Sequence, residues 1–354
     1  MLATVMQFGC AAKTTEISLI YPSAPEEPRV AFLKSYTGDT MYQKWGFLDI
    51  LFGSQGSSMG QLYGVAAKGG KVYGALFRPP AVVVFDDKEQ RVTYLGTSGP
   101  GRLSLPTGIA LGDDGIVYAA DATEKKIQVY TNEGVHKRSI GSKNDLNNPA
   151  GIAVNNKLQR LYIVDSRDNK VKVYSLQGEK LFEFGGPGAG KGAFNGPTNI
   201  AVDKRDDAVY VVDTMNFRVQ VFDQDGRFLR TFGTVGDLPG QFSRPKGIGI
   251  DSEGHIYVVD AAFGNLQIFD EGGRLLLYFG NYGQGPGEFT FPAGLYVDED
   301  DRIFVADSGN HRIQSFQYLS ERWKKGHPEE YKKYLELQAN PEGKKEEAPK
   351  KVNQ

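Results

Sequence analysis

The sequence predicts an all-β fold built from six copies of one four-stranded unit, and two independent markers carry that prediction. A short strand of the Val-Tyr-x-x-Asp type recurs at intervals of 44 to 48 residues and ends at Leu76, Asp121, Asp165, Asp213, Asp260 and Asp307. A proline stands before the first strand of most units, at intervals of 43 to 48 residues, at Pro106, Pro149, Pro197, Pro245 and Pro292. Units of this length with short strands and many turns are typical of a β-propeller.

The unit is clearest over residues 208–233, where short strands are separated by the turns Thr-Met-Asn-Phe and Asp-Gln-Asp-Gly. Complete copies read Pro-x-Gly-Ile-Ala-Val-Asp, then Val-Tyr-Val-x-Asp, then Asn-x-Arg-Ile-Gln-Val-Phe, then Asp-x-x-Gly and Phe-Gly. This pattern resembles the NHL repeat, best at 197–233 and 292–316, and the resemblance covers residues 29 to 318. It implies a six-bladed propeller of the NHL type. The first unit departs from the pattern, because Leu76 replaces the aspartate and Phe77-Arg78-Pro79-Pro80 replaces the Asn-x-Arg turn.

The last unit lacks its outer strand, and the N-terminal part of the chain offers a replacement. Phe32-Leu33-Lys34-Ser35-Tyr36 is similar to Phe228-Leu229-Arg230-Thr231-Phe232. We therefore expect residues 29–36 to pair in the last blade, which leaves no blade incomplete. The predicted blades span residues 63–96, 106–141, 149–185, 197–233, 245–280, and 292–318 completed by 29–38.

Composition limits the class of protein. The chain has 354 residues, with 44 glycines, 17 prolines and a net charge of −2, which does not suggest a polyanion partner. Its single cysteine, Cys10, excludes a disulfide framework and a thiolate zinc site. No run approaches the roughly 20 apolar residues that span a bilayer.

Residues 1–28 are predicted to be a signal-like segment and a tether. The run MLATVMQFG before Cys10 resembles the end of a bacterial lipoprotein signal, which implies acylation of Cys10 and a periplasmic location. Gln7 and the missing basic region depart from that pattern, and the alternative is an ordinary N-terminus with an incidental cysteine. The proline-rich stretch 21–28 is predicted to be extended.

Two segments outside the strands carry other patterns. Met41, Trp45, Leu48 and Phe52 share one helical face, which predicts a helix over 41–52 that packs on the ring or serves as a docking element. In the charged tail, residues 319–354, the acids that follow Pro328 predict a helix start. From 340 on, the tail is predicted to be disordered. The helix could pack on the propeller or dock on a partner.

A propeller usually binds on the face that carries the turns between strands two and three and the blade-to-blade connections. We name this the loop face. Aromatic and arginine side chains, the types enriched in binding hot spots, are expected there. The candidate binding residues are Phe77, Arg78, Arg167, Met215, Asn216, Phe217, Phe263, Tyr282 and His311.

The repeated aspartates are interpreted as structural, because the same residue at the same place in five blades serves the blade. Each can accept backbone N–H groups in the next turn and face the cation five residues on. The expected pairs are Asp121 with Lys126, Asp165 with Lys170, Asp213 with Arg218 and Asp307 with Arg312; Asp260 has Asn265 at that position.

The other sites that the sequence suggests are weak. The glycine run at 185–192 lacks the strand–GK[ST]–helix context of a phosphate loop. Four histidines, of which only His311 suits the loop face, cannot supply the three-histidine zinc site of an NHL-like amidating lyase. Asn199, which stands where other blades have glycine, and Asp203 are candidates for the channel. RNA binding is not favoured, because the loop-face charges are mixed.

The sequence therefore favours a non-catalytic, monomeric binding propeller without a cofactor. Its partner would be a protein or a peptide-like ligand, and membrane association would come only from a lipid anchor. The alternative is a metal-dependent propeller lyase or hydrolase with its site in the central channel.

Overall fold

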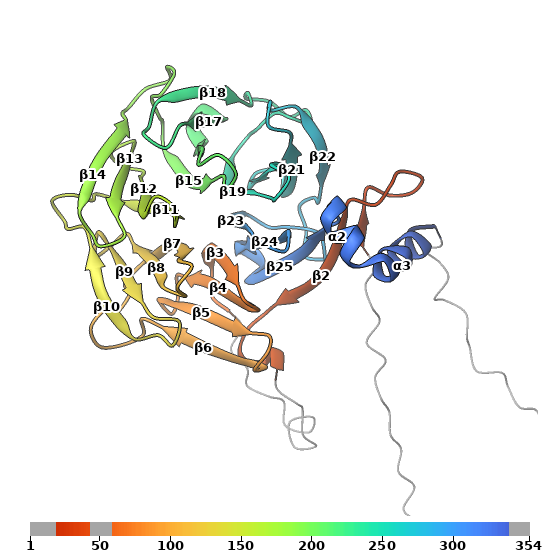
Figure 1. Cartoon of the computed structure of the whole chain (residues 1–354), viewed down its shortest axis with the longest axis horizontal. Helices are drawn as coiled ribbons and strands as arrows, with labels where there is room; N and C mark the ends of the chain where they lie inside the picture. Colours follow the sequence, from red (N-terminus) through yellow and green to blue (C-terminus); the bar gives the residue numbers. More distant parts are fainter. Residues whose placement is uncertain (1–18, 43–58, 340–354) are drawn as a thin grey trace, which may run out of the picture.

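In a computed structural model, which describes residues 19–42 and 59–339, six antiparallel sheets stand in a ring around a central channel (Figure 1). Five sheets have four strands and the sixth has five. The first strand of each blade is innermost, and successive strands step outward. The predicted six-bladed propeller of four-stranded blades is confirmed.

The first three blades follow the chain without a crossover. Blade one contains β3 (Leu62–Lys68), β4 (Lys71–Leu76), β5 (Ala81–Asp86) and β6 (Arg91–Leu95). Blade two contains β7 (Pro106–Leu111), β8 (Val117–Asp121), β9 (Lys126–Tyr130) and β10 (His136–Ile140). Blade three contains β11 (Pro149–Asn155), β12 (Arg160–Asp165), β13 (Lys170–Ser175) and β14 (Lys180–Gly185).

Blades four to six complete the ring. Blade four contains β15 (Pro197–Val202), β16 (Val209–Asp213), β17 (Arg218–Phe222) and β18 (Phe228–Phe232). Blade five contains β19 (Pro245–Ile250), β20 (Ile256–Asp260), β21 (Asn265–Phe269) and β22 (Leu275–Phe279). Blade six contains β23 (Pro292–Val297), β24 (Arg302–Asp307) and β25 (Arg312–Tyr318), and then β2 (Val30–Tyr36) and β1 (Ile20–Tyr21) from the N-terminal side.

The ring closes as predicted, through an N-terminal strand in the last blade. Strand β2 pairs antiparallel with β25, from Val30 opposite Tyr318 to Tyr36 opposite Ile313. The expectation of an extended tether over 21–28 was wrong, because β1 pairs with β2 and residues 22–29, which connect the two strands, reverse direction with a turn at 24–25. Cys10 and the rest of the signal-like segment lie outside the described residues.

The core lies between the blades. One buried cluster joins Tyr210 and Val219 of blade four to Ile248 and Ile256 of blade five, and similar clusters lie between other neighbouring blades. Because a blade buries its apolar faces against its neighbours, no blade has a separate core.

The third residue of each innermost strand is glycine, except in blade four, and this allows neighbouring innermost strands to approach closely. A Cβ added to Gly108 of β7 would lie 2.3 Å from the carbonyl oxygen of Ala150 in β11. A Cβ on Gly294 of β23 would lie 2.5 Å from the carbonyl oxygen of Tyr63 in β3. The close backbone approach therefore requires glycine. Asn199 takes this position in β15.

The C-terminal helices α2 (Glu321–Gly326) and α3 (Pro328–Ala339) lie beside blade six (Figure 1). The hydroxyl of Ser320 caps α2 by accepting the N–H of Trp323, which is buried. Trp323 stacks on the ring of His327, with ring centres 4.8 Å apart. Lys324 and Tyr331 both reach Glu27 in the turn between β1 and β2. Helix α3 thus contacts the N-terminal turn through Tyr331.

Two predictions fall mostly outside the described residues. Only 41 and 42 of the helix predicted over 41–52 are described, and they belong to the 3-10 turn η1 (Asp39–Tyr42). The tail from 340 onward is also outside. Within 19–42 and 59–339, no helix combines the length and the apolar character that crossing a membrane requires.

Candidate functional site

The repeated aspartates join each blade to the connection before it. In all five, the backbone N–H of the residue two positions before the proline donates to the carboxylate, at 2.7–2.8 Å. The aspartates have no exposed surface. The two sequence markers, proline and aspartate, are therefore parts of one contact. This arrangement is what a structural role requires.

The cation that faces each aspartate differs between blades. Arg218 contacts Asp213 at 2.9 Å and Arg312 contacts Asp307 at 2.8 Å, as expected. The expected pair of Asp165 with Lys170 was wrong: Lys172 makes this contact, at 2.8 Å, and Lys170 bonds to Glu183. Asp121 lies opposite Lys126 in the ladder between β8 and β9, but no ion pair between these two side chains is found in the described part of the chain. Its carboxylate accepts the backbone N–H groups of Thr123 and Glu124 in the turn that follows, both at 3.0 Å.

The predicted binding residues on the loop face differ in exposure. The exposed members are Arg78, Arg167, Met215, Tyr282 and His311, whereas Phe77, Asn216, Phe217 and Phe263 are partly buried. Phe77 packs edge-to-face on Tyr63, and the guanidinium of Arg78 lies over the ring of Phe77.

Most side chains of the turn after β16 make contacts inside the propeller and are not free to bind a partner. Residues Thr214–Asn216 form the 3-10 turn η2, and Phe217 closes it in the left-handed region with φ 55°. The side chain of Phe217 packs against the core cluster between blades four and five. Asn216 donates to Asp213 and to the carbonyl of Gly188. Only Met215 projects into solvent, with 53 % of its surface exposed.

The turns and connections of blades four to six expose more apolar side chains than the candidate binding residues predicted from the sequence. We name these residues the loop-face patch. Each has more than half of its surface exposed, and they are Met215, Val235, Leu238, Tyr282 and Phe291. Tyr282 and Phe291 pack edge-to-face at 5.8 Å. Val235, Leu238 and Phe291 were missed, although apolar residues in a glycine-rich connection are a usable signal.

A cavity of about 350 Å³ occupies the central channel and extends to the opposite face, which carries the turns between strands one and two and which we name the turn face. Aliphatic side chains of the innermost strands form its walls. Charged and polar residues form its rim: Lys68, Asp113, Asn156, Lys204, Arg205, Ser252, Glu299 and Arg322. Asn199 and Asp203, the predicted channel residues, both line it.

Carboxylates in this cavity already have partners. Asp203 accepts from the guanidinium of Arg205 at 2.7 Å. Asp251 accepts from Tyr257 at 2.8 Å and from His255 at 2.9 Å. Burial raises the pKa of Asp298, which pairs with Arg302 at 2.7 Å.

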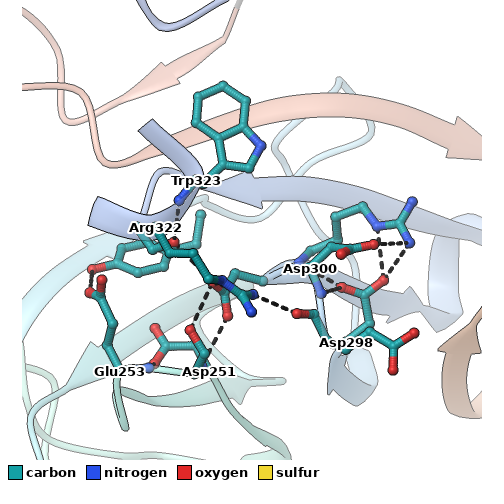
Figure 2. Close-up of polar contacts among 12 residues, drawn as sticks. Asp251, Glu253, Asp298, Asp300, Arg322 and Trp323 are labelled. Atoms are coloured by element: carbon teal, nitrogen blue, oxygen red, sulfur yellow. Dashed lines mark hydrogen bonds and ion pairs between the residues drawn. The ribbon is translucent and has the colours of Figure 1, made fainter. Parts of the chain in front are cut away.

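Helix α2 places one arginine at the turn-face opening of the channel. Arg322 donates to the carbonyl of Glu299 at 2.5 Å and to Asp301 at 3.2 Å. Figure 2 shows Arg322 directed toward the turns that carry Asp251 and Asp298, whereas Trp323 of the same helix points away from them. The C-terminal segment therefore contributes to the cavity rim, which the repeat pattern alone did not indicate.

The described residues contain no group of three His, Cys, Asp or Glu side chains placed to hold a metal ion. No histidine is among the residues that line the cavity. His255 is close in sequence to the lining residues Asp251 and Ser252, and its ring is hydrogen-bonded to Asp251 in the turn between β19 and β20.

The family models agree with this architecture. A family described as 6-bladed beta-propeller matches residues 194–263 and 252–324, and the NHL repeat matches residues 146–174. The chain is therefore a six-bladed β-propeller, and one of its stretches matches the NHL repeat. No curated protein matches the sequence.

Solved structures show the same fold at low identity. A protein of unknown function from Bacteroides thetaiotaomicron is 17 % identical with a TM-score of 0.60, over 82 % of this chain and 75 % of the other. An auxiliary nutrient binding protein from the same organism is 16 % identical with a TM-score of 0.58, over 76 % and 71 %. A catalytically inactive virginiamycin B lyase from Staphylococcus aureus with quinupristin is 16 % identical with a TM-score of 0.54, over 74 % and 81 %. The fold thus occurs in binding proteins and in an enzyme.

Proposed function

We propose that this propeller is a non-catalytic binding protein of the bacterial envelope, and that its loop face holds a protein or a peptide-like ligand. The observation that carries the proposal is the loop-face patch, in which each large apolar side chain is more than half exposed. Tyr282 and Phe291 contact each other within it, and exposed apolar side chains that form a patch are typical of an interaction site.

Unpaired arginines on the same face add to this surface. Within the described ranges, the side chains of Arg78 and Arg167 have no ion pair and no hydrogen bond, and both are exposed. Arginine and tyrosine dominate the binding energy of many protein interfaces, because they combine apolar area with directional polar groups.

Three carboxylates that line the channel cavity are already paired. Asp203, Asp251 and Asp298 are held by Arg205, His255 and Arg302, so that each already has a fixed partner. In this proposal the fixed pairs favour binding over proton transfer, because a general base must be free to take up a proton from the substrate.

The second candidate is a metal-dependent lyase or hydrolase with its site in the channel. The cavity itself favours this alternative, because its volume suits a small ligand. Metal analysis of the purified protein separates the two: stoichiometric zinc, calcium or iron, lost together with a ligand-cleaving activity on chelation, would favour the enzyme.

The experiment that tests the main proposal is partner capture from envelope extract. We expect the wild-type protein to retain a partner that the Arg78→Ala/Tyr282→Ala variant loses while remaining folded. The matched control is Lys204→Ala, which removes an exposed cation at the turn-face rim and should leave capture unchanged. Equal capture by all three proteins would contradict a loop-face site.

The envelope location and the monomeric state are parts of the same proposal. Mass measurement of the N-terminal peptide from cells tests acylation at Cys10, and light scattering tests the monomer.

A further inference from the structure

One blade carries a cation at the loop-face end of its innermost strand. The second residue of this strand is small or uncharged in five blades, where it is Tyr63, Thr107, Ala150, Thr198 or Ala293. In β19 the same position is Lys246, and this side chain is half-buried. Among the residues that the structure describes, its ammonium group has no hydrogen bond and no ion pair.

A second cation stands two residues earlier. Arg244 lies in the bend that leads into β19, two residues before Lys246. The backbone of Arg244 is fixed, because its N–H donates to Asp260 at 2.9 Å. Its guanidinium is exposed and has no partner within 19–42 and 59–339. Burial, and then the charge of Arg244, lower the pKa of Lys246.

Two cations at the same end of other blades show the usual arrangement, in which the cation is fully engaged. Arg218 bonds to Asp213 and to the carbonyls of Gly190 and Ala193. Lys172 bonds to Asp165, to Asp168 and to a backbone carbonyl. Two neighbouring cations without an acceptor, one of them half-buried, therefore suit a carboxylate supplied from outside.

The surroundings indicate what kind of molecule carries that carboxylate. The connection 234–244 ends at Arg244 and exposes Val235 and Leu238, by 64 % and 63 %. Arg78 and Arg167 leave two more unpaired cations on the same face. A ligand that complements these features has both acidic and apolar side chains.

We propose that Lys246 and Arg244 form a carboxylate site at the loop-face end of the channel, and that the partner presents an acidic peptide segment with apolar side chains beside its acids. This inference rests on the proposed function and specifies the chemistry of the partner.

The test compares two synthetic peptides, one that alternates glutamate with leucine and one with glutamine in place of each glutamate. We expect the acidic peptide to bind the wild-type protein about tenfold more tightly than the glutamine peptide. Lys246→Met keeps the apolar stem of the side chain and should abolish most of this preference, as should Arg244→Gln. Lys204→Gln, which removes a cation at the opposite end of the channel, should keep it.

Equal affinity for the two peptides would overturn the inference, and so would an unchanged preference in Lys246→Met with an unchanged melting temperature. Displacement of the acidic peptide by an equal concentration of inorganic phosphate would show a simple anion site and would overturn the peptide assignment.

The same proteins separate this inference from the proposed function. If Lys246→Met captures the envelope partner as the wild type does, while Arg78→Ala/Tyr282→Ala does not, the carboxylate site fails and the loop-face site stands. If the acidic peptide binds through Lys246, but both Lys246→Met and the Arg78→Ala/Tyr282→Ala variant capture the envelope partner normally, the carboxylate site stands and the proposed loop-face function fails.

Discussion

The ammonium group of Lys172 lies 2.8 Å from the carboxylate of Asp165, and both side chains are almost fully buried, with 5 % and 0 % exposed. Blades four and six place Gln220 and Gln314 at the corresponding position, and each donates to its aspartate at 3.1 Å. Blade three therefore uses a cation where these blades use an amide, and its hydrogen bonds to Asp165 and Asp168 raise the pKa of Lys172 against the effect of burial.

Replacing Lys172 by methionine should destabilise the protein strongly. The change leaves the carboxylate of Asp165 buried without its cation, which costs about 3 kcal/mol for pairs of this kind. Urea unfolding measures the loss. The control is Lys170→Met, which breaks a partly exposed pair with Glu183 and should cost less than about 1 kcal/mol. Equal losses would show that the buried pair has no special role.

Replacing Gly108 by alanine should also destabilise the ring. The added methyl would lie 2.3 Å from the carbonyl oxygen of Ala150, so that two innermost strands must separate. Overpacking of this kind costs about 1–3 kcal/mol. Gly190→Ala is the matched control, because no atom lies within 4 Å of its added Cβ. A Gly108→Ala protein with the thermal stability of the control would contradict the close-contact explanation.

Replacing Trp323 by alanine should release the C-terminal helices from blade six. Trp323 is only 8 % exposed and stacks on His327 and Tyr334. Limited proteolysis should then cut near residues 320–330 much faster than in the wild type, while the melting temperature of the blades changes little. Unchanged proteolysis would mean that the contacts of Arg322 and Lys324 suffice to hold α2.

The pair of His255 and Asp251 should make stability depend on pH. The hydrogen bond to Asp251 raises the pKa of His255 against burial, with a further contribution from Glu253. A raised folded-state pKa stabilises the protein below the ordinary histidine pKa of about 6.5, and this stabilisation is lost as the pH rises through the folded-state value.

The wild type should therefore exceed His255→Gln in unfolding free energy by more at about pH 5.5 than at about pH 9. Chemical denaturation at both pH values measures the difference, and Tyr318, whose ring packs on His255, should be left unchanged in both proteins. A difference that is the same at both pH values would exclude a titrating pair.

The sequence was sufficient for the parts of this fold that repeat. The spacing of Pro197 and Asp213 predicted a blade. The structure shows why these two residues recur together, because the backbone N–H of Asn195, two residues before the proline, donates to the carboxylate of Asp213. The likeness of residues 32–36 to an outer strand also predicted the closure of blade six, because a missing strand can be counted along the chain.

Non-repeating features depended on tertiary structure. Phe217 and Met215 are neighbours in one turn, yet one packs into the core and the other is exposed, because the left-handed backbone at Phe217 turns its side chain inward. Lys170 and Lys172 project to the same face of β13, but Lys172 is buried beside Asp165, with 5 % exposed, whereas Lys170 is 35 % exposed and pairs with Glu183. The position of Arg322 at the channel depended on how α2 docks against blade six.

By itself, then, the sequence determined the number of blades and their strand order, since these follow from local patterns that recur. Only the tertiary structure decided which face is apolar, where the cavity lies and which cations lack a partner. Those properties are set by contacts between residues far apart in the chain. Arg322, for example, contacts Asp301 in the turn between β23 and β24, and Lys324 contacts Glu27. No local sequence pattern encodes such contacts.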